Sequence, residues 1–164
     1  MSNVKQLALA FQMYTQDYDE IIPWYVNATY DFTNTAWWVV VAPYVKNTQL
    51  LSCPSQRTSL DYGVVYPHVS NVGSAQPLAQ IQYPAETGVL TETEQQNTSS
   101  GRSGNLYLCY CSFHYAQGSI SWAYCRGLAW PGRHNEGNNW AFVDGHAKWM
   151  KYSDSINNQR LWNH

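Results

Sequence analysis

The stretch RHNEGNNWAFVDGHAKWMK, residues 133–151, decides the fold at the C-terminal end of the chain. Aromatic and apolar residues alternate with polar ones on both sides of Asp144-Gly145, a pair that is typical of tight turns between antiparallel strands. The alternation predicts strands over residues 138–143 and 146–151. We therefore expect a β-hairpin whose turn has positive backbone angles at Asp144 and Gly145.

His134 stands ten residues before Asp144, and a hairpin alone does not explain it. The favoured interpretation is structural: the imidazole hydrogen-bonds back to the Asp144 carboxylate and holds the preceding loop against the hairpin. A metal or ligand site that also uses Asp144, His146 or Glu136 is the second interpretation, and catalysis is the third.

A second informative stretch, SNVKQLALAFQMYTQDYDE, opens the chain at residues 2–20. Apolar side chains recur there at helical spacing, which predicts an amphipathic helix over residues 1–20, capped by Ser2 or Asn3. Leu9 and Met13 form a second, weaker apolar strip, as in helices that pack on two sides. The main stripe consists of Val4, Leu7, Ala8, Phe11, Tyr14, Thr15 and Tyr18.

The remaining segments complete an α+β pattern. Residues 34–47 read as either a short helix or a strand, because three consecutive valines favour a strand while Pro43 interrupts both structures. Residues 95–104 read as a polar loop. We expect one domain over residues 1–164, in which the N-terminal helix lies across an antiparallel sheet formed within residues 21–164. Further strands are predicted over residues 60–67, 87–93, 105–113 and 120–125.

The composition limits the classes of partner. Charged residues make up 12% of the chain and the net charge is -2, so no basic surface is available for nucleic acid. Aromatic residues make up 15%, and a ring with a polar edge suits contacts to a sugar or a protein. Most rings should lie in the core, and the candidates for an exposed binding surface are Trp24, Trp37, Trp38, Trp122, Trp130, Trp140 and Trp149.

The four cysteines, Cys53, Cys109, Cys111 and Cys125, indicate disulfides in an exported protein. Cys109 and Cys111 lie on one face of a predicted strand, so a bond between them would distort it. Bonds from this pair to Cys53 and Cys125 are favoured, and four free buried thiols are the alternative. None of the cysteines has metal-ligand spacing to another.

Four stretches resemble the pseudopilin-like proteins that have a prepilin-type N-terminus, a group related to type II secretion subunits and type IV pilins. They are residues 2–24, which end in Ile-Pro-Trp; APYVKNTQLLSCPS, residues 42–55; LAQIQYPAETGVLTETE, residues 78–94; and the His-x9-Asp-Gly signature of His134, Asp144 and Gly145. The resemblance favours a helix over residues 34–47. Residues 98–130 match least and read as an insertion.

The resemblance implies a pilin-like head domain on the periplasmic side, at the cell surface or outside the cell. In this family an apolar half-helix precedes the matched region, and we expect it to join the subunit to other pseudopilin-like subunits and to the membrane. If an upstream cysteine of the family pairs with the Cys-Pro-Ser segment, Cys53 has no partner here. No cofactor is expected, and calcium near Asn135, Asp144 and Asp154 is the alternative.

A secreted glycoside hydrolase on the same fold is the alternative function, with polysaccharide as its substrate. Such enzymes need two carboxylates about 5 Å or about 6.5–9.5 Å apart. Glu92, Glu94 and Asp144 are the candidates. Glu92 and Glu94 project from the same face of a predicted strand, where two like charges would raise the pKa of one of them.

Overall fold

A computed structural model of the chain describes residues 1–56, 60–71, 73–74, 76–93, 107–108, 128–129 and 132–163. A five-stranded sheet has the order β3-β1-β2-β4-β5. Four of its strands are antiparallel neighbours and β3 lies parallel to β1. The predicted α+β class, with an N-terminal helix and an antiparallel sheet, is confirmed. The strands are β1 (Tyr62–Val65), β2 (Gly88–Glu92), β3 (Tyr107–Leu108), β4 (Gly137–Phe142) and β5 (Ala147–Lys151).

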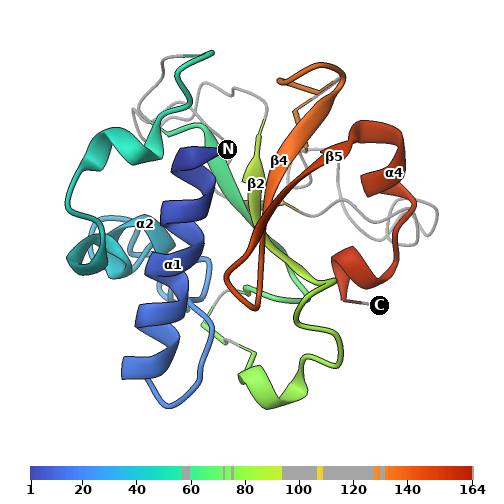
Figure 1. Cartoon of the computed structure of the whole chain (residues 1–164). Helices are drawn as coiled ribbons and strands as arrows, with labels where there is room; N and C mark the ends of the chain where they lie inside the picture. Colours follow the sequence, from blue (N-terminus) through green and yellow to red (C-terminus); the bar gives the residue numbers. More distant parts are fainter. Residues whose placement is uncertain are drawn as a thin grey trace.

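Helices cover the sheet on two sides. Figure 1 shows α1 (Ser2–Asp17) on one side of the β2–β4–β5 strands and α4 (Tyr152–Ile156) on the other. Every residue of β1, β2 and β4 is buried, whereas β5 at the edge is partly exposed. The central strands therefore tolerate few polar side chains unless these find hydrogen-bond partners.

The face of α1 follows the predicted stripe. Val4, Leu7 and Phe11 are buried, while Leu9 and Met13 are 51% and 49% exposed. Tyr18 is an exception because the helix ends at Asp17, and its exposed ring stacks on Tyr14. In the described part of the chain, no helix combines the length and the apolar character needed to cross a bilayer.

The predicted cap of α1 is wrong. Met1 occupies the N-cap position and makes no side-chain capping bond. The side chain of Asn3 instead donates a hydrogen bond from Nδ2 to the Ser52 carbonyl, at 2.9 Å. The first turn of α1 is thereby tied to the segment that leads into Cys53.

Residues 34–47 form helix, as the resemblance implies, rather than a strand. α2 (Trp37–Val40) is followed by a 3-10 turn, η1 (Ala42–Tyr44). Pro43 lies at the start of η1, where its missing N–H costs no hydrogen bond. The three other 3-10 turns of the described chain are η2 (Thr48–Leu51), η3 (Leu78–Gln80) and η4 (Arg160–Trp162).

The C-terminal hairpin is confirmed, although its turn differs from the prediction. Of the two turn residues only Gly145 has a positive φ, 90°. The N–H of Gly145 donates to the Phe142 carbonyl, and the N–H of Phe142 donates to the His146 carbonyl. Three residues therefore form the loop, an arrangement that needs a left-handed residue only at its last position.

Most of the described tryptophans belong to the core, so the expected exposure of Trp37, Trp38 and Trp140 is wrong. The Trp140 ring packs edge-on against Trp162 with 5.3 Å between centroids. Trp37 and Trp38 belong to α2, where the Trp37 ring lies 5.7 Å from the ring of Phe11 in α1, and all three tryptophans are members of the hydrophobic core. Trp24 is half-buried and Trp149 is 37% exposed, while Trp122 and Trp130 lie outside the described residues.

Candidate functional site

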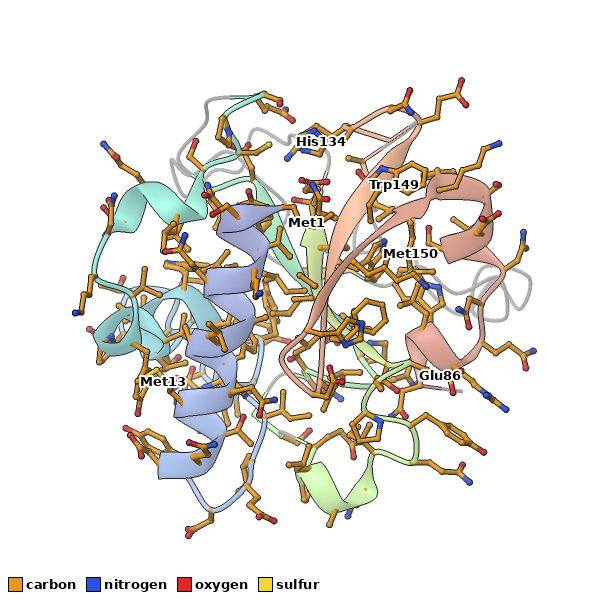
Figure 2. The ribbon with its side chains drawn as sticks, in the orientation of Figure 1. Met1, Met13, Glu86, His134, Trp149 and Met150 are labelled. Carbon is orange, nitrogen blue, oxygen red and sulfur yellow. The ribbon has the colours of Figure 1, made fainter. Side chains whose placement is uncertain are left out.

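Three chemically active side chains from distant parts of the chain meet at one end of the sheet: Cys53, Glu92 and His134. Nε2 of His134 lies 2.8 Å from Oε1 of Glu92 and 3.5 Å from Sγ of Cys53. One ligand atom from each residue falls within 4.8 Å of the other two. Figure 2 shows His134 at the same end of the β4–β5 pair as Trp149.

Glu92 is the last residue of β2, and its side chain is 1% exposed. The neighbouring strand satisfies its carboxylate, because Asn139 donates its backbone N–H to Oε2 at 2.8 Å and its Nδ2 to Oε1 at 2.9 Å. A buried carboxylate is tolerated only when it is hydrogen-bonded or paired in this way. Asn139 thus fixes the direction in which the carboxylate faces His134.

Cys53 follows η2, in the Cys-Pro-Ser segment, and Asp61 holds it in place. The N–H of Cys53 donates to Oδ2 of Asp61 at 2.8 Å, and the N–H of Asp61 donates to the Leu51 carbonyl at 2.9 Å. The thiol is buried and free, so the favoured disulfide to Cys53 is not formed. Cys109, Cys111 and Cys125 lie outside the described residues.

Tyr62 stands beside the thiol in β1. Burial raises the pKa of Tyr62, and the neighbouring Cys53 and Glu92 side chains, with a hydrogen bond to Cys53, raise it further. The phenol therefore stays protonated and acts as a hydrogen-bond donor toward the sulfur. A donor in this position stabilises a thiolate.

His134 projects from a tight turn that precedes β4. The backbones of His134 and Gly137 exchange hydrogen bonds in both directions. Asn135 and Glu136 between them have φ of 53° and 61°, as in the primed turns of hairpins. Asn tolerates this conformation well and Glu tolerates it poorly, so the turn stores some strain next to the site.

Arg133 adds a positive charge and ties the turn to the sheet. Its guanidinium donates from Nη1 to the Asp61 carbonyl at 3.1 Å and from Nη2 to the Thr93 carbonyl. These bonds connect the turn to the ends of the segments that carry Cys53 and Glu92. The site is thus supported by the backbone of three chain segments.

The expected hydrogen bond between His134 and Asp144 is wrong. Asp144 lies in the β4–β5 turn, where its Oδ1 is 2.6 Å from Nδ1 of His146. His134 precedes β4 and Asp144 follows it, so the strand separates them. The nine residues between His134 and Asp144 in the signature therefore span strand β4 and do not indicate a contact between the two side chains.

The carboxylates proposed for hydrolysis do not converge. Glu92 bonds to Asn139, and Asp144 lies five residues further along β4 and its turn, roughly 16 Å away at the rise of a strand. That separation exceeds both spacings used by glycoside hydrolases. Glu94 lies outside the described residues. The described carboxylates thus give no support to a hydrolase built on Glu92 and Asp144.

Two of the three residues named for calcium, Asp144 and Asp154, make other side-chain contacts. Asp144 pairs with His146, and Oδ1 of Asp154 accepts a hydrogen bond from Ser153. The metal-type group that the described residues do form contains sulfur, nitrogen and oxygen, whereas calcium prefers oxygen ligands alone. His146 and Glu136 are not members of that group.

The geometry of the cluster distinguishes between nucleophilic catalysis and metal coordination. A nucleophilic triad needs one imidazole nitrogen at the nucleophile and the other at the carboxylate. Here Nε2 makes both contacts, and because a carboxylate accepts hydrogen bonds, that nitrogen carries the proton and cannot take one from the thiol. Three donor atoms facing a common point suit metal coordination instead.

Trp149 forms a fixed aromatic surface beside the cluster. Its Nε1 donates to the His134 carbonyl at 2.7 Å, and its six-membered ring lies against Gly137. A Cβ added at Gly137 would stand 2.5 Å from that ring and 2.4 Å from the Met150 carbonyl oxygen. Gly137 therefore allows the close contact that holds Trp149 in place.

We expect Gly137→Ala to lower the free energy of unfolding by about 1–3 kcal/mol, because the new methyl group displaces either the indole or the β5 backbone. Urea unfolding followed by circular dichroism measures the change. Ala147→Gly, a substitution in the facing strand that creates space instead of filling it, is the control. An unchanged midpoint in Gly137→Ala would contradict the close packing of Trp149.

The sequence predicts a different role for each member of the cluster: a disulfide for Cys53, an acidic pair for Glu92 and a contact within the hairpin for His134. No local pattern in the sequence connects the three residues. Comparison with known proteins adds no assignment, because no protein-family model, no curated protein and no solved structure matches this chain.

Proposed function

We propose that this chain is the head domain of a pseudopilin-like subunit with a pilin-like fold, located in the periplasm, at the cell surface or outside the cell. The four stretches that resemble this family support the proposal. The arrangement of α1 against an antiparallel sheet agrees with it, because a pilin head also rests on the helix that enters it. The subunit would assemble with others of its kind through an apolar half-helix upstream of Met1.

The observation that carries the proposal is the second apolar strip of α1. Leu9 and Met13 are four residues apart, on one face of the helix, and each leaves about half of its surface in water. Met13 is labelled on α1 in Figure 2. Single exposed apolar residues are common, but two adjacent ones on a helix that is already packed on its other side favour a helical neighbour.

The exposed aromatic surface gives the head a contact point. The indole of Trp149 is held by its hydrogen bond and by Gly137, so a ligand that stacks on it needs little ordering of the ring. We propose that this ring contacts a polymer or protein partner of the subunit. A rigid ring with one open face suits a sugar ring as well as an aliphatic side chain.

The test uses the chain joined to an N-terminal apolar half-helix and expressed in a bacterium that assembles pseudopilin filaments. We expect sheared filament fractions to contain the wild-type subunit. Leu9→Asp with Met13→Asp should reduce the incorporated subunit at least about tenfold, because two charges would be buried at the helix contact without partners.

The control is Tyr30→Asn, which removes the most exposed of the large apolar and aromatic side chains of the described residues, in the segment between α1 and α2. Tyr30 has a φ of 55°, which Asn tolerates, so the variant should fold and incorporate normally. Equal incorporation of the Asp double variant and the wild type, with both folded, would refute the assembly role of this strip.

A further inference from the structure

We propose that Cys53, Glu92 and His134 form a mononuclear site for a divalent transition metal, with Zn²⁺ as the best fit and one coordination position open to solvent. The site is independent of the filament role, because none of its ligands belongs to the exposed strip of α1. Its ligands come from the segment after η2, from the end of β2 and from the turn before β4.

The distances suit a tetrahedral ion. Zn–S and Zn–N bonds of about 2.3 and 2.0 Å at a tetrahedral angle place sulfur and nitrogen about 3.5 Å apart. Sγ of Cys53 and Nε2 of His134 are 3.5 Å apart. Nε2 and Oε1 of Glu92, at 2.8 Å, need to separate by about 0.5 Å for the ion to enter between them.

The donor set selects the kind of metal. A thiolate and an imidazole favour zinc and similar borderline ions over calcium and magnesium, which prefer oxygen. The charges also agree, because Zn²⁺ with the Cys53 thiolate, the Glu92 carboxylate and a neutral His134 gives no net charge in a buried place. On binding, the thiol proton of Cys53 passes to solvent, and the proton of His134 moves from Nε2 to Nδ1.

The surrounding contacts already orient the ligands. Asn139 holds the Glu92 carboxylate with two hydrogen bonds, and Tyr62 donates toward the Cys53 sulfur. Hydrogen-bond partners of this kind orient the residues that bind a metal and tune the basicity of their ligand atoms. Cys53 and Glu92 are buried while the His134 side chain is 30% exposed, so the fourth position opens on the side of His134.

The open position distinguishes this site from a purely structural one. Structural zinc sites are closed by four protein ligands, whereas sites with three keep room for water or for a ligand atom from outside. The exposed side of the cluster also carries Trp149, which is bonded to the His134 carbonyl. A partner that stacks on Trp149 would therefore lie on the same side of the molecule as the open coordination position. A carboxylate or hydroxyl group of that partner could then bind the ion.

The experiment titrates chelator-treated, reduced protein with Zn²⁺ against a chromophoric competitor and records the spectrum of the Co²⁺ form. We expect one tightly bound ion per chain and a thiolate-to-cobalt charge-transfer band. Cys53→Ser and His134→Gln should each weaken binding by at least about 100-fold, since the loss of a supporting partner alone costs about 10–100-fold. His146→Gln, at the other end of β4, should bind like the wild type.

The wild-type spectrum keeps the test decisive even if a variant fails to fold. A Co²⁺ form without the charge-transfer band, or a chain that binds no metal, would overturn the proposal. So would a folded Cys53→Ser protein whose affinity equals that of the wild type, because the metal would then sit on other residues.

Discussion

Glu92→Ala is expected to lower the free energy of unfolding by about 3–5 kcal/mol. The substitution leaves both buried donors of Asn139 and the imidazole of His134 without their acceptor, and each unpaired buried group costs about 1–3 kcal/mol. Removing one member of a buried ionic pair has a cost of the same size. Urea unfolding in the presence of a chelator measures the effect without any contribution from metal.

Two variants locate the cause. Glu92→Gln keeps one carbonyl acceptor and the shape of the side chain, so about 1–3 kcal/mol should be lost. Glu86→Ala removes a carboxylate that is half-exposed and paired with Arg160. An exposed ion pair of this kind contributes at most about 1 kcal/mol to the free energy of unfolding. If Glu92→Ala lowers the free energy of unfolding no more than Glu86→Ala does, the hydrogen bonds of the Glu92 carboxylate to Asn139 and His134 do not stabilise the fold.

Trp140→Ala is expected to destabilise the fold by about 3–5 kcal/mol, the usual cost of emptying a buried tryptophan site. Its ring is fully buried, touches Trp162 edge-on and lies over Gly88, where a Cβ would come within 2.8 Å of it. Neither neighbour can move in to fill the space, because both are fixed in the sheet or against it. Thermal and urea unfolding of the variant give the value.

Trp149→Ala is the matched control for Trp140→Ala. The same ring is removed from the residue that pairs with Asn139, one strand position from Trp140, but at a site that is 37% exposed. We expect a loss of about 1–2 kcal/mol, in proportion to the smaller apolar area that is buried there. Similar losses in the two variants would show that the sheet is not covered on the Trp140 side.

The N-terminal helix and the C-terminal hairpin could be predicted from the sequence because each shows a local periodic pattern of apolar residues. The spacing of Val4, Leu7 and Phe11 defines the buried face of α1, and the alternation around Asp144-Gly145 defines the hairpin. The same reasoning did not identify the cap of α1. Asn3 meets Ser52, and a contact between residues so far apart in the chain leaves no local pattern.

The burial of Glu92 could not be predicted, because it depends on a second layer. Alternation along a strand indicates which residues share a face and does not indicate that both faces are covered. Once α1 and α4 close the two sides, Glu92 has to be satisfied by Asn139 on the adjacent strand. The pairing register of β2 with β4 makes that contact, and no motif in either strand specifies it.

The site itself depends on long-range contacts. Cys53 and His134 are 81 residues apart, and they meet only through the pairing of β1 with β2 and of β2 with β4. Metal-ligand spacing in a sequence detects ligands that share a loop or a helix. It does not detect three ligands that each come from a different segment.

The zinc K-edge X-ray absorption spectrum of the loaded wild-type protein tests the central claim most directly. Coordination by Cys53, Glu92 and His134 predicts one sulfur scatterer at about 2.3 Å and nitrogen or oxygen scatterers at about 2.0 Å, with the outer-shell pattern of one imidazole. A shell made only of nitrogen and oxygen, or one containing several sulfurs, would contradict it and place the ion elsewhere in the chain.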